Sequence, residues 1–500
     1  MKFNRKLIFC LSISTLVGCG GGSSSQAPTA NSNLPTPIPT PAPTPAPPTT
    51  VGTPPSGSCS TNSQLIYILS VLSDNVTLEA SGADNIADHD LNTAWTSDEA
   101  NASFTLDLSE NYKVDSIRIA WRNGEQTQHN FTLTGSADNT GFYDIATLQS
   151  TGSINLPEVY DIDDTNLRYL KLETNFTSAT NAGISEVFVI GCPLDGTAVE
   201  APSNFSLSAL NLNPDVPPGE NFDLLTWGLD NPQDNDNNGR SDRVSERDLD
   251  NGFENEFFYT GDDGGMVFNA PIYAPKTSTN TSYARTELRE MLRRGNTSIS
   301  TQGQNENNWV LGYQPEVTQP IGGRGGHLSA TMAVNYVART GENFQLGRFI
   351  IGQIHAGDDE PIRLYYRKRP EHKTGYIYFA HEINGGDEIL KMVYGPEYGD
   401  FSNQPNFTSE PSVGFGLDEV FSYEIIQEGA RIDVLIRKGG LSDPIVGHQF
   451  IDMNEVNSGY DVQDEWMYFK AGAYTGNNSG NPDEYFQATF YQLINTHPAN

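Results

Sequence analysis

Gln353 and His355 stand two residues apart at the end of an apolar run, residues 349–352, that contains two isoleucines. A short β-branched run bounded by glycine is typical of a buried strand. Because side chains alternate along a strand, both polar residues would share one face. An imidazole with an ordinary pKa of about 6.5 accepts protons near neutral pH, and the amide beside it is a neutral hydrogen-bond donor. A single histidine in a strand is more often structural, so other residues must show whether His355 belongs to a functional site.

Two further stretches, 285–290 and 468–474, place polar side chains on one strand face in the same way. Apolar residues dominate the opposite faces, as a strand that packs on a core requires. A face rich in arginine, lysine, tyrosine and histidine suits a cleft for an acidic polymer better than a solvated surface. The residues on these faces are Arg285, Glu287, Arg289, Tyr468, Lys470, Gly472 and Tyr474.

The three stretches resemble motifs of the polysaccharide lyase family 7 of alginate lyases, which carry R-[ST]-E-L-R, Q-[IV]-H and Y-F-K-A-G-x-Y in that order. They stand here at residues 285–289, 353–355 and 468–474. The resemblance covers residues 202–497. It implies a jelly-roll β-sandwich whose concave sheet binds alginate, and a reaction that needs no cofactor.

The resemblance implies a catalytic set of Arg285, Gln353, His355 and Tyr474. β-Elimination removes the C5 proton of a uronate, which is barely acidic until its carboxylate is neutralised by donors such as Arg285 and Gln353. His355 would take the proton and Tyr474, a phenol that cations help to share its proton, would supply one to the leaving O4. In guluronate these groups lie on opposite faces of the sugar. In mannuronate they share a face, and Tyr474 could serve both roles.

Further polar residues are expected to hold neighbouring uronate carboxylates or to orient the arginines. Arg363 and Arg367 alternate along another predicted strand, residues 363–368, and would extend the cationic set. The candidate substrate-binding residues are Glu287, Arg289, Arg363, Arg367, Tyr468 and Lys470.

Two other classes of protein fit parts of this pattern. A glycoside hydrolase on a similar sandwich needs two carboxylates flanking the bond, whereas these stretches are poor in acids. A non-catalytic surface lipoprotein that binds acidic glycans would keep the cations but has no need of His355 and Tyr474 together. Only elimination creates a conjugated uronate that absorbs ultraviolet light. This absorbance therefore distinguishes a lyase from a hydrolase and from a non-catalytic binding protein.

The first 58 residues predict export and a membrane anchor. A basic start is followed by an apolar run, residues 7–17, that is too short to span a bilayer. Residues 16–19 resemble a bacterial lipoprotein cleavage box, which implies a signal peptide of residues 1–18, a lipidated Cys19 and a location at the outer membrane or cell surface. The Pro-, Ser- and Thr-rich residues 19–58 predict an extended linker.

The segment 59–192 predicts a smaller β domain, because its alternating runs are bounded by turn residues. Cys59 and Cys192 bracket it, and in an exported protein one disulfide between them is the simplest expectation. Residues 88–95, 112–114 and 184–187 resemble discoidin-like, family 32 carbohydrate-binding modules. This resemblance implies a structural calcium site, which suits oxygen ligands. Its candidate ligands are Asp88, Asp90, Thr93 and Glu186. Trp121, Arg122 and His129 are candidate sugar contacts, but a place in the core or on the surface fits each of them at least as well.

The remaining chain divides into a connector, residues 193–201, and the domain 202–497. An acidic run at residues 234–242 is interpreted as a polar turn, because Ser245 stands where a calcium loop would place its closing glutamate. The net charge of −34 argues against nucleic-acid binding. We therefore expect an all-β, monomeric protein whose partners are alginate and, through the lipid, a membrane.

Overall fold

The computed structural model describes most of the chain from residue 63 onward. The predicted signal peptide, Cys19, the linker and Cys59 lie outside the described residues. Nearly all regular structure in the described part is strand, which confirms the all-β fold class. None of the helices found there has the length and hydrophobicity that crossing a bilayer requires. The described ranges are 63–73, 82–96, 101–176, 183–194, 199, 201–396 and 399–498.

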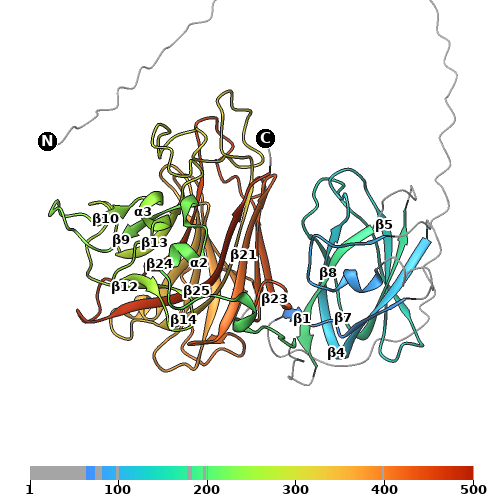
Figure 1. Ribbon diagram of the computed structural model, residues 1–500. Coiled ribbons are helices and arrows are strands. Elements are labelled where there is room, and N and C mark those ends of the chain that lie inside the picture. Colours follow the sequence, from blue (N-terminus) through green and yellow to red (C-terminus); the bar gives the residue numbers. More distant parts are fainter. Residues whose placement is uncertain are drawn as a thin grey trace, which may run out of the picture. The chain divides into compact units, whose positions relative to one another are not determined.

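The first module consists of strands β1 to β8, drawn in blue to green in Figure 1. In the described residues it is an eight-stranded antiparallel sheet, with the path β1-β8-β4-β7-β5-β6 and with β2 and β3 paired to β4 and β8. Its elements are β1 Gln64–Ile66, β2 Ser70–Ser73, η1 Ala83–Ile86, β3 Trp95–Thr96, β4 Asn101–Trp121, β5 Asn130–Ser136, β6 Tyr143–Gln149, β7 Glu158–Asn175 and β8 Gly183–Pro193.

Two of the candidate sugar contacts belong to the core of this module. Trp121 is fully buried and donates from Nε1 to the Tyr160 hydroxyl at 2.8 Å. The ring of His129, also buried, packs 5.0 Å from that of Trp121. Of the two alternatives for these rings, the core is the one observed, and neither ring is placed to contact sugar. Cys192 is disulfide-bonded, and its pairing with Cys59 stays a prediction.

The second module is a sandwich of two antiparallel sheets, drawn in green to red in Figure 1. Among the described residues one sheet has ten strands, with the path β10-β9-β13-β24-β15-β16-β17-β18-β19 and β20 beside β17. The other has seven, in the order β11-β12-β25-β14-β21-β22-β23. Strands distant in sequence are neighbours in both sheets, as in a jelly roll.

The strands of the ten-stranded sheet are β9 Trp227–Asn231, β10 Asp242–Val244, β13 Arg285–Glu290, β15 Arg348–His355, β16 Ile362–Arg367, β17 Thr374–Glu382, β18 Glu388–Tyr394, β19 Gly399–Phe401, β20 Phe415–Gly416 and β24 Tyr468–Thr475. Those of the seven-stranded sheet are β11 Phe258–Thr260, β12 Met266–Pro271, β14 Gly326–Tyr336, β21 Val420–Glu428, β22 Arg431–Arg437, β23 Ile445–Asp452 and β25 Tyr485–Thr496. Short helices are η2 Leu207–Leu210, α2 Pro218–Asn221, η3 Leu224–Thr226, α3 Glu246–Asp250 and η4 Asn343–Gln345.

The core between the two sheets decides which way the polar side chains point. Leu288 of β13, Ile354 of β15 and Phe469 of β24 are fully buried in one cluster with Phe268 and Phe490 of the other sheet. Burying each such side chain stabilises the fold by about 1.5–3 kcal/mol. Because strand side chains alternate, their neighbours must face the opposite side of the ten-stranded sheet, where the candidate site lies.

Candidate active site

The three motif strands are direct neighbours, with β24 between β13 and β15. On one side of β24, Arg285 is paired in register with Tyr474 and Arg289 with Lys470. On the other side, Gln353 is paired with Lys470 and His355 with Tyr468. The structure therefore brings the four candidate catalytic residues together on one face.

Glu287 lies at the centre of this face and is fully buried. Arg285 donates from Nη1 to its Oε2 at 3.0 Å, and the Lys470 ammonium lies 2.6 Å from the same oxygen. Gln353 donates from Nε2 to Oε1. An ionised carboxylate accepts several hydrogen bonds, so Glu287 fixes the orientation of these donors. It orients the arginine, as the sequence predicted, and is too buried to contact a sugar itself.

Arg285 and Tyr474 form the second fixed contact of the site. The Arg285 guanidinium lies 3.6 Å from the centre of the Tyr474 ring, a cation–π arrangement. Burial raises the pKa of Tyr474, and the nearby Arg285 only partly offsets this. The phenol is therefore less acidic than its cationic surroundings suggested, and it remains protonated at neutral pH. This is the state that a general acid requires.

His355 is held by its backbone and by a neighbouring ring. Its Nδ1 lies 2.7 Å from the Ala356 carbonyl oxygen, and its ring stacks on that of Tyr468 with centroids 4.9 Å apart. A carbonyl only accepts, so Nδ1 carries the hydrogen and Nε2 carries the lone pair. Burial, followed by the positive charge of Lys470, lowers the pKa of His355 to about 3. The ring is therefore neutral near pH 7, with Nε2 as the proton acceptor.

Arg289 and Lys470 form a buried cationic layer beneath the catalytic groups. Lys470 lies 3.2 Å from Asp230, which also binds Arg243 at 2.8 Å. Arg289 donates to Asn308 at 3.0 Å, and its guanidinium lies 3.9 Å from the ring centre of Tyr468. Both residues are at most 3 % exposed, so they act on a substrate through their charge more than by contact.

This layer has an excess of positive charge. Among the described residues that meet Glu287 or Asp230 in it, the cations Arg243, Arg285 and Lys470 outnumber the two carboxylates. This local surplus around Arg285 suits a uronate carboxylate, although the whole chain carries −34 and acids surround Arg363 on the same sheet. Asp230 and Arg243 come from β9 and β10, and no sequence motif marked them.

The two arginines of β16 are already engaged by protein groups and are not free to bind a substrate carboxylate. Arg367 is fully buried and donates to the backbone oxygens of Asn343, Leu346 and Pro405. The prediction that Arg367 binds substrate is therefore contradicted, because its guanidinium ties two loops to the sheet. Arg363 is surrounded by acids, and its ion-pair partners are Glu360, Glu382 and Glu388.

Glu360 is a site residue that the sequence did not reveal. It lies in the turn between β15 and β16, and its Oε1 is 3.3 Å from Nε2 of His355. The only signal in the sequence is that the turn is acidic, and acidic turns are common on surfaces. Its position beside the proton acceptor depends on how the turn folds back over the strand.

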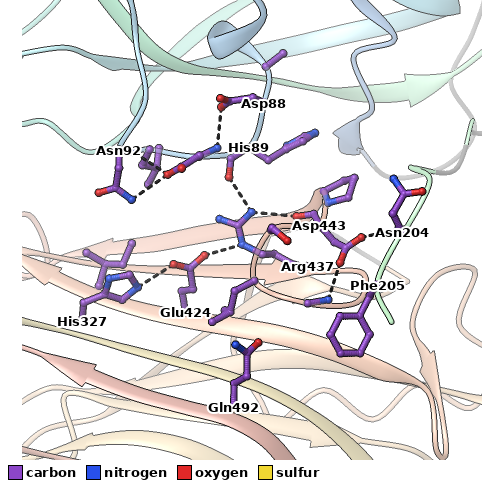
Figure 2. Close-up of a pocket in the computed structure, with 18 of the residues that line it drawn as sticks. Asp88, His89, Asn92, Asn204, Phe205, His327, Glu424, Arg437, Asp443 and Gln492 are labelled. Atoms are coloured by element: carbon purple, nitrogen blue, oxygen red, sulfur yellow. Dashed lines mark hydrogen bonds and ion pairs between the residues drawn. The ribbon is translucent and has the colours of Figure 1, made fainter. Parts of the chain in front are cut away.

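The calcium ligands expected in the first module are arranged around one turn and one buried acid. Asp88 accepts hydrogen bonds from the Thr93 hydroxyl at 2.7 Å and from the Asp90 amide at 3.0 Å. Figure 2 shows Asp88, His89 and Asn92 of this turn. The Asp90 carboxylate turns instead toward Asn92. Glu186 is fully buried, and neither carboxylate oxygen has a hydrogen-bond partner of good geometry among the described residues.

The surroundings of Glu186 fit a cation. Burial raises the pKa of Glu186 well above its usual range, and the negative charge of Asp88 raises it further. A buried carboxylate without a partner is costly, and an oxygen-seeking cation would remove that cost. The donor set of Glu186, Asp88 and Thr93 is therefore chemically suited to calcium.

The acidic turn at residues 234–242 is satisfied by its own backbone. Oxygens of Asp234, Asp236 and Asp242 approach within 4.8 Å of one another. However, Asp234 accepts from the amides of Asn238 and Gly239, at 2.9 and 2.8 Å. These bonds agree with its interpretation as a polar turn.

Comparisons with known proteins agree with this geometry. A family model described as alginate lyase matches residues 222–497, and an F5/8 type C domain model matches residues 70–188. A curated alginate lyase from Klebsiella pneumoniae is 48% identical over 286 residues, which are 56% of this chain and 92% of that protein. A crystal structure of the alginate lyase from Klebsiella pneumoniae covers 57% of this chain and 99% of its own, with 48% identity and a TM-score of 0.52.

A β-sandwich with a cationic face, a neutral histidine and a protonated tyrosine defines the second module as a polysaccharide lyase. The chain belongs to the alginate lyase family, with a discoidin-like F5/8 type C domain before the lyase domain. The two resemblances found in the motifs are confirmed. Both matched stretches lie inside the predicted domains 59–192 and 202–497, whose bounds remain predictions.

Proposed function

We propose that this protein cleaves the 1,4-glycosidic bonds of alginate by β-elimination at the site on β13, β15 and β24. The observation that carries the proposal is the strand register, which places a proton acceptor and a proton donor on one face beside a buried arginine. Family membership supports the same reaction. The products are shorter chains with a 4,5-unsaturated uronate at the new end.

Each step of the reaction has a group suited to it. Arg285 neutralises the uronate carboxylate, and Gln353, whose amide nitrogen carries two hydrogens, can bind both Glu287 and the substrate. The neutral His355 takes the C5 proton at Nε2. The electron pair of the C5–H bond forms the C4–C5 double bond, and the C4–O4 bond breaks. Tyr474 then gives its proton to O4.

The proposed activity is tested by incubating the protein with alginate and following ultraviolet absorbance and reducing ends together. Both signals should rise in parallel. A matched control is alginate whose carboxylates have been reduced to alcohols, which Arg285 cannot neutralise and which should give neither signal. Reducing ends without absorbance would indicate a hydrolase, and binding without either signal would indicate a non-catalytic glycan-binding protein.

The structure argues against the hydrolase in particular. A hydrolase needs two carboxyl groups that reach the scissile bond. Of the acids on this face, Glu287 is fully buried beneath its cationic partners. Glu287 therefore has no free oxygen to offer as nucleophile or acid, and Glu360, beside His355, is paired with Arg363.

We further propose that the first module holds a structural calcium ion with Asp88, Thr93 and Glu186, and that Asp90 shapes the turn. The buried carboxylate of Glu186 supports this: the backbone amides of His89 and Val187 approach it, but it has no hydrogen bond of good geometry among the described residues. At a calcium concentration 100-fold above its dissociation constant, the ion would stabilise the module by about 2.7 kcal/mol. The ion has no part in the elimination.

Calcium should therefore raise the thermal midpoint of the wild-type protein and leave Glu186→Gln unchanged, measured by calorimetry with and without a chelator. Asp236→Asn, in the polar turn of the other module, is the matched control and should respond as the wild type does. If Asp236→Asn loses the response and Glu186→Gln keeps it, the ion belongs to the turn of the second module.

We also propose that the protein is exported and lipid-anchored at Cys19 on the outer membrane or cell surface. The basic and apolar start and the lipoprotein-like residues 16–19 support this. The first module, as a carbohydrate-binding module, would keep the enzyme near its polymer, because tethering raises the local concentration of substrate.

A further inference from the structure

Nε2 of His355 and a carboxylate oxygen of Glu360 lie close enough to share a proton. Nδ1 of His355 donates to the Ala356 carbonyl at 2.7 Å, so the neutral ring has only a lone pair at Nε2. Oε1 of Glu360 lies 3.3 Å from that nitrogen. Two acceptors at this distance repel unless one of them is protonated.

The surroundings favour protonation of Glu360 over protonation of His355. From β24 and β13, the imidazole is faced by the charges of Lys470, Arg285 and Arg289, which add to burial in lowering its pKa. Glu360 is mostly buried, with 19 % of its side chain exposed, and its carboxyl is hydrogen-bonded to that of Glu382 of β17. These two influences raise the pKa of Glu360 to about 7, although Arg363 of β16 opposes them.

The remaining charged groups near this pair do not reverse that preference. Glu388 of β18 reaches the cluster through its ion pair with Arg363. Tyr468 and Tyr474 of β24 are neutral phenols at neutral pH, because burial raises the pKa of each. Below neutral pH, the Glu360 carboxyl is therefore protonated. It hydrogen-bonds Glu382, and a hydrogen on its Oε1 would face Nε2 of His355.

We propose that Glu360 is a positioning residue that switches His355 between a blocked and an available base. The protonated carboxyl occupies the lone pair of Nε2, which cannot then accept the C5 proton of a uronate. The ionised carboxylate has no hydrogen to donate, and Arg363, 3.7 Å from its Oε2, can hold it. The inference rests on the proposed function, because it concerns the base of that reaction.

The ionised carboxylate also stabilises the product of proton transfer. When the C5–H bond breaks, a new N–H bond forms at Nε2 and the ring becomes an imidazolium. Its new hydrogen faces Oε1 of Glu360, so an ion pair forms where two acceptors stood. Tyr474 has meanwhile lost its proton to O4, and proton exchange with water restores both groups.

Activity should therefore rise with pH as Glu360 ionises. A group that must lose a proton with a pKa of about 7 leaves about one enzyme molecule in 30 active at pH 5.5. The wild type should thus gain about 30-fold in turnover between pH 5.5 and pH 8.5. If Glu360 had only a structural role, replacing it would leave the shape of the pH profile unchanged.

The variant Glu360→Gln tests this, because its amide resembles the protonated carboxyl in shape and always carries hydrogens. We expect its turnover to be no higher than that of the wild type at pH 5.5, at least 30-fold below it at pH 8.5, and without a rise between these values. Glu388→Gln is the matched control: it also meets Arg363 but does not contact His355 among the described residues, and it should keep the rise. A Glu360→Gln profile parallel to that of the wild type would overturn the proposal.

A second measurement does not depend on catalysis. In the substrate-free protein, the nitrogen-15 resonance of Nε2 of His355 should shift with a midpoint near pH 7 as the Glu360 hydrogen leaves. In Glu360→Gln it should stay constant over the same range. A wild-type resonance that does not move there would overturn the proposal. If alginate is not cleaved but this titration is seen, the proposed function is wrong, whereas the pairing of His355 with Glu360 is confirmed.

Discussion

Replacing Tyr474 with phenylalanine should lower turnover on alginate by about 10²–10⁴-fold, the scale of a lost general acid. The phenol is the group that protonates the leaving O4, and burial keeps it protonated at neutral pH by raising its pKa. The aromatic ring remains, so the contact with the Arg285 guanidinium at 3.6 Å should survive. Binding of the polymer should therefore change little while turnover falls.

Tyr283→Phe provides a matched control for this prediction. The ring of Tyr283 packs edge-on against Tyr474 with centroids 6.4 Å apart, and the substitution removes the same hydroxyl group from this neighbouring ring. We expect Tyr283→Phe to retain most of its turnover, measured as the rate of ultraviolet absorbance at saturating alginate. If Tyr474→Phe keeps more than a tenth of the wild-type rate, another group must protonate O4.

The sequence predicts the residues of the site where period-2 alternation and core packing act together. Leu288 and Phe469 must enter the core, which forces Arg285 and Lys470 to the other face. The motifs that lie far apart in the chain are brought together by β24, which pairs with both other strands. Alternation does not predict that pairing, and the family resemblance supplied it.

The same alternation misleads for Arg367, because a strand pattern gives the face of a residue and not what covers that face. Arg367 has the same position in the alternating pattern as Arg363. However, it donates its hydrogen bonds to backbone oxygens of two loops, at Asn343 and Pro405. Loop conformation depends on contacts made far along the chain, so no local pattern shows it.

The sequence did not predict Glu360 for a related reason: its role depends on where the turn places it in the fold, not on its being a glutamate. A glutamate in an acidic turn is ordinary, and only the 3.3 Å approach to His355 gives it a function. The pKa of His355 also departs from its ordinary value for reasons absent from the motif. Burial and Lys470, a neighbour across the sheet, lower it to about 3.

Replacing His355 with alanine should separate the two sugars of alginate. On guluronate blocks, the C5 proton and the leaving O4 lie on opposite faces, so no other group of the proposed set replaces Nε2, and turnover should fall by about 10²–10⁴-fold. On mannuronate blocks both lie on the Tyr474 side, and the loss should be smaller. The ratio of the two losses cancels any change in the folded fraction.

The pH dependence of that residual activity gives a second, independent check. Tyr474 can act as the base only as a phenolate, and burial raises its pKa, so the phenolate forms only at alkaline pH. Turnover of His355→Ala on mannuronate should therefore increase with pH beyond the range in which the wild type levels off. His355→Phe, which keeps a ring to stack on Tyr468, should behave in the same way. Equal losses on both sugars would mean that His355 serves chiefly to neutralise the carboxylate and not to remove the proton.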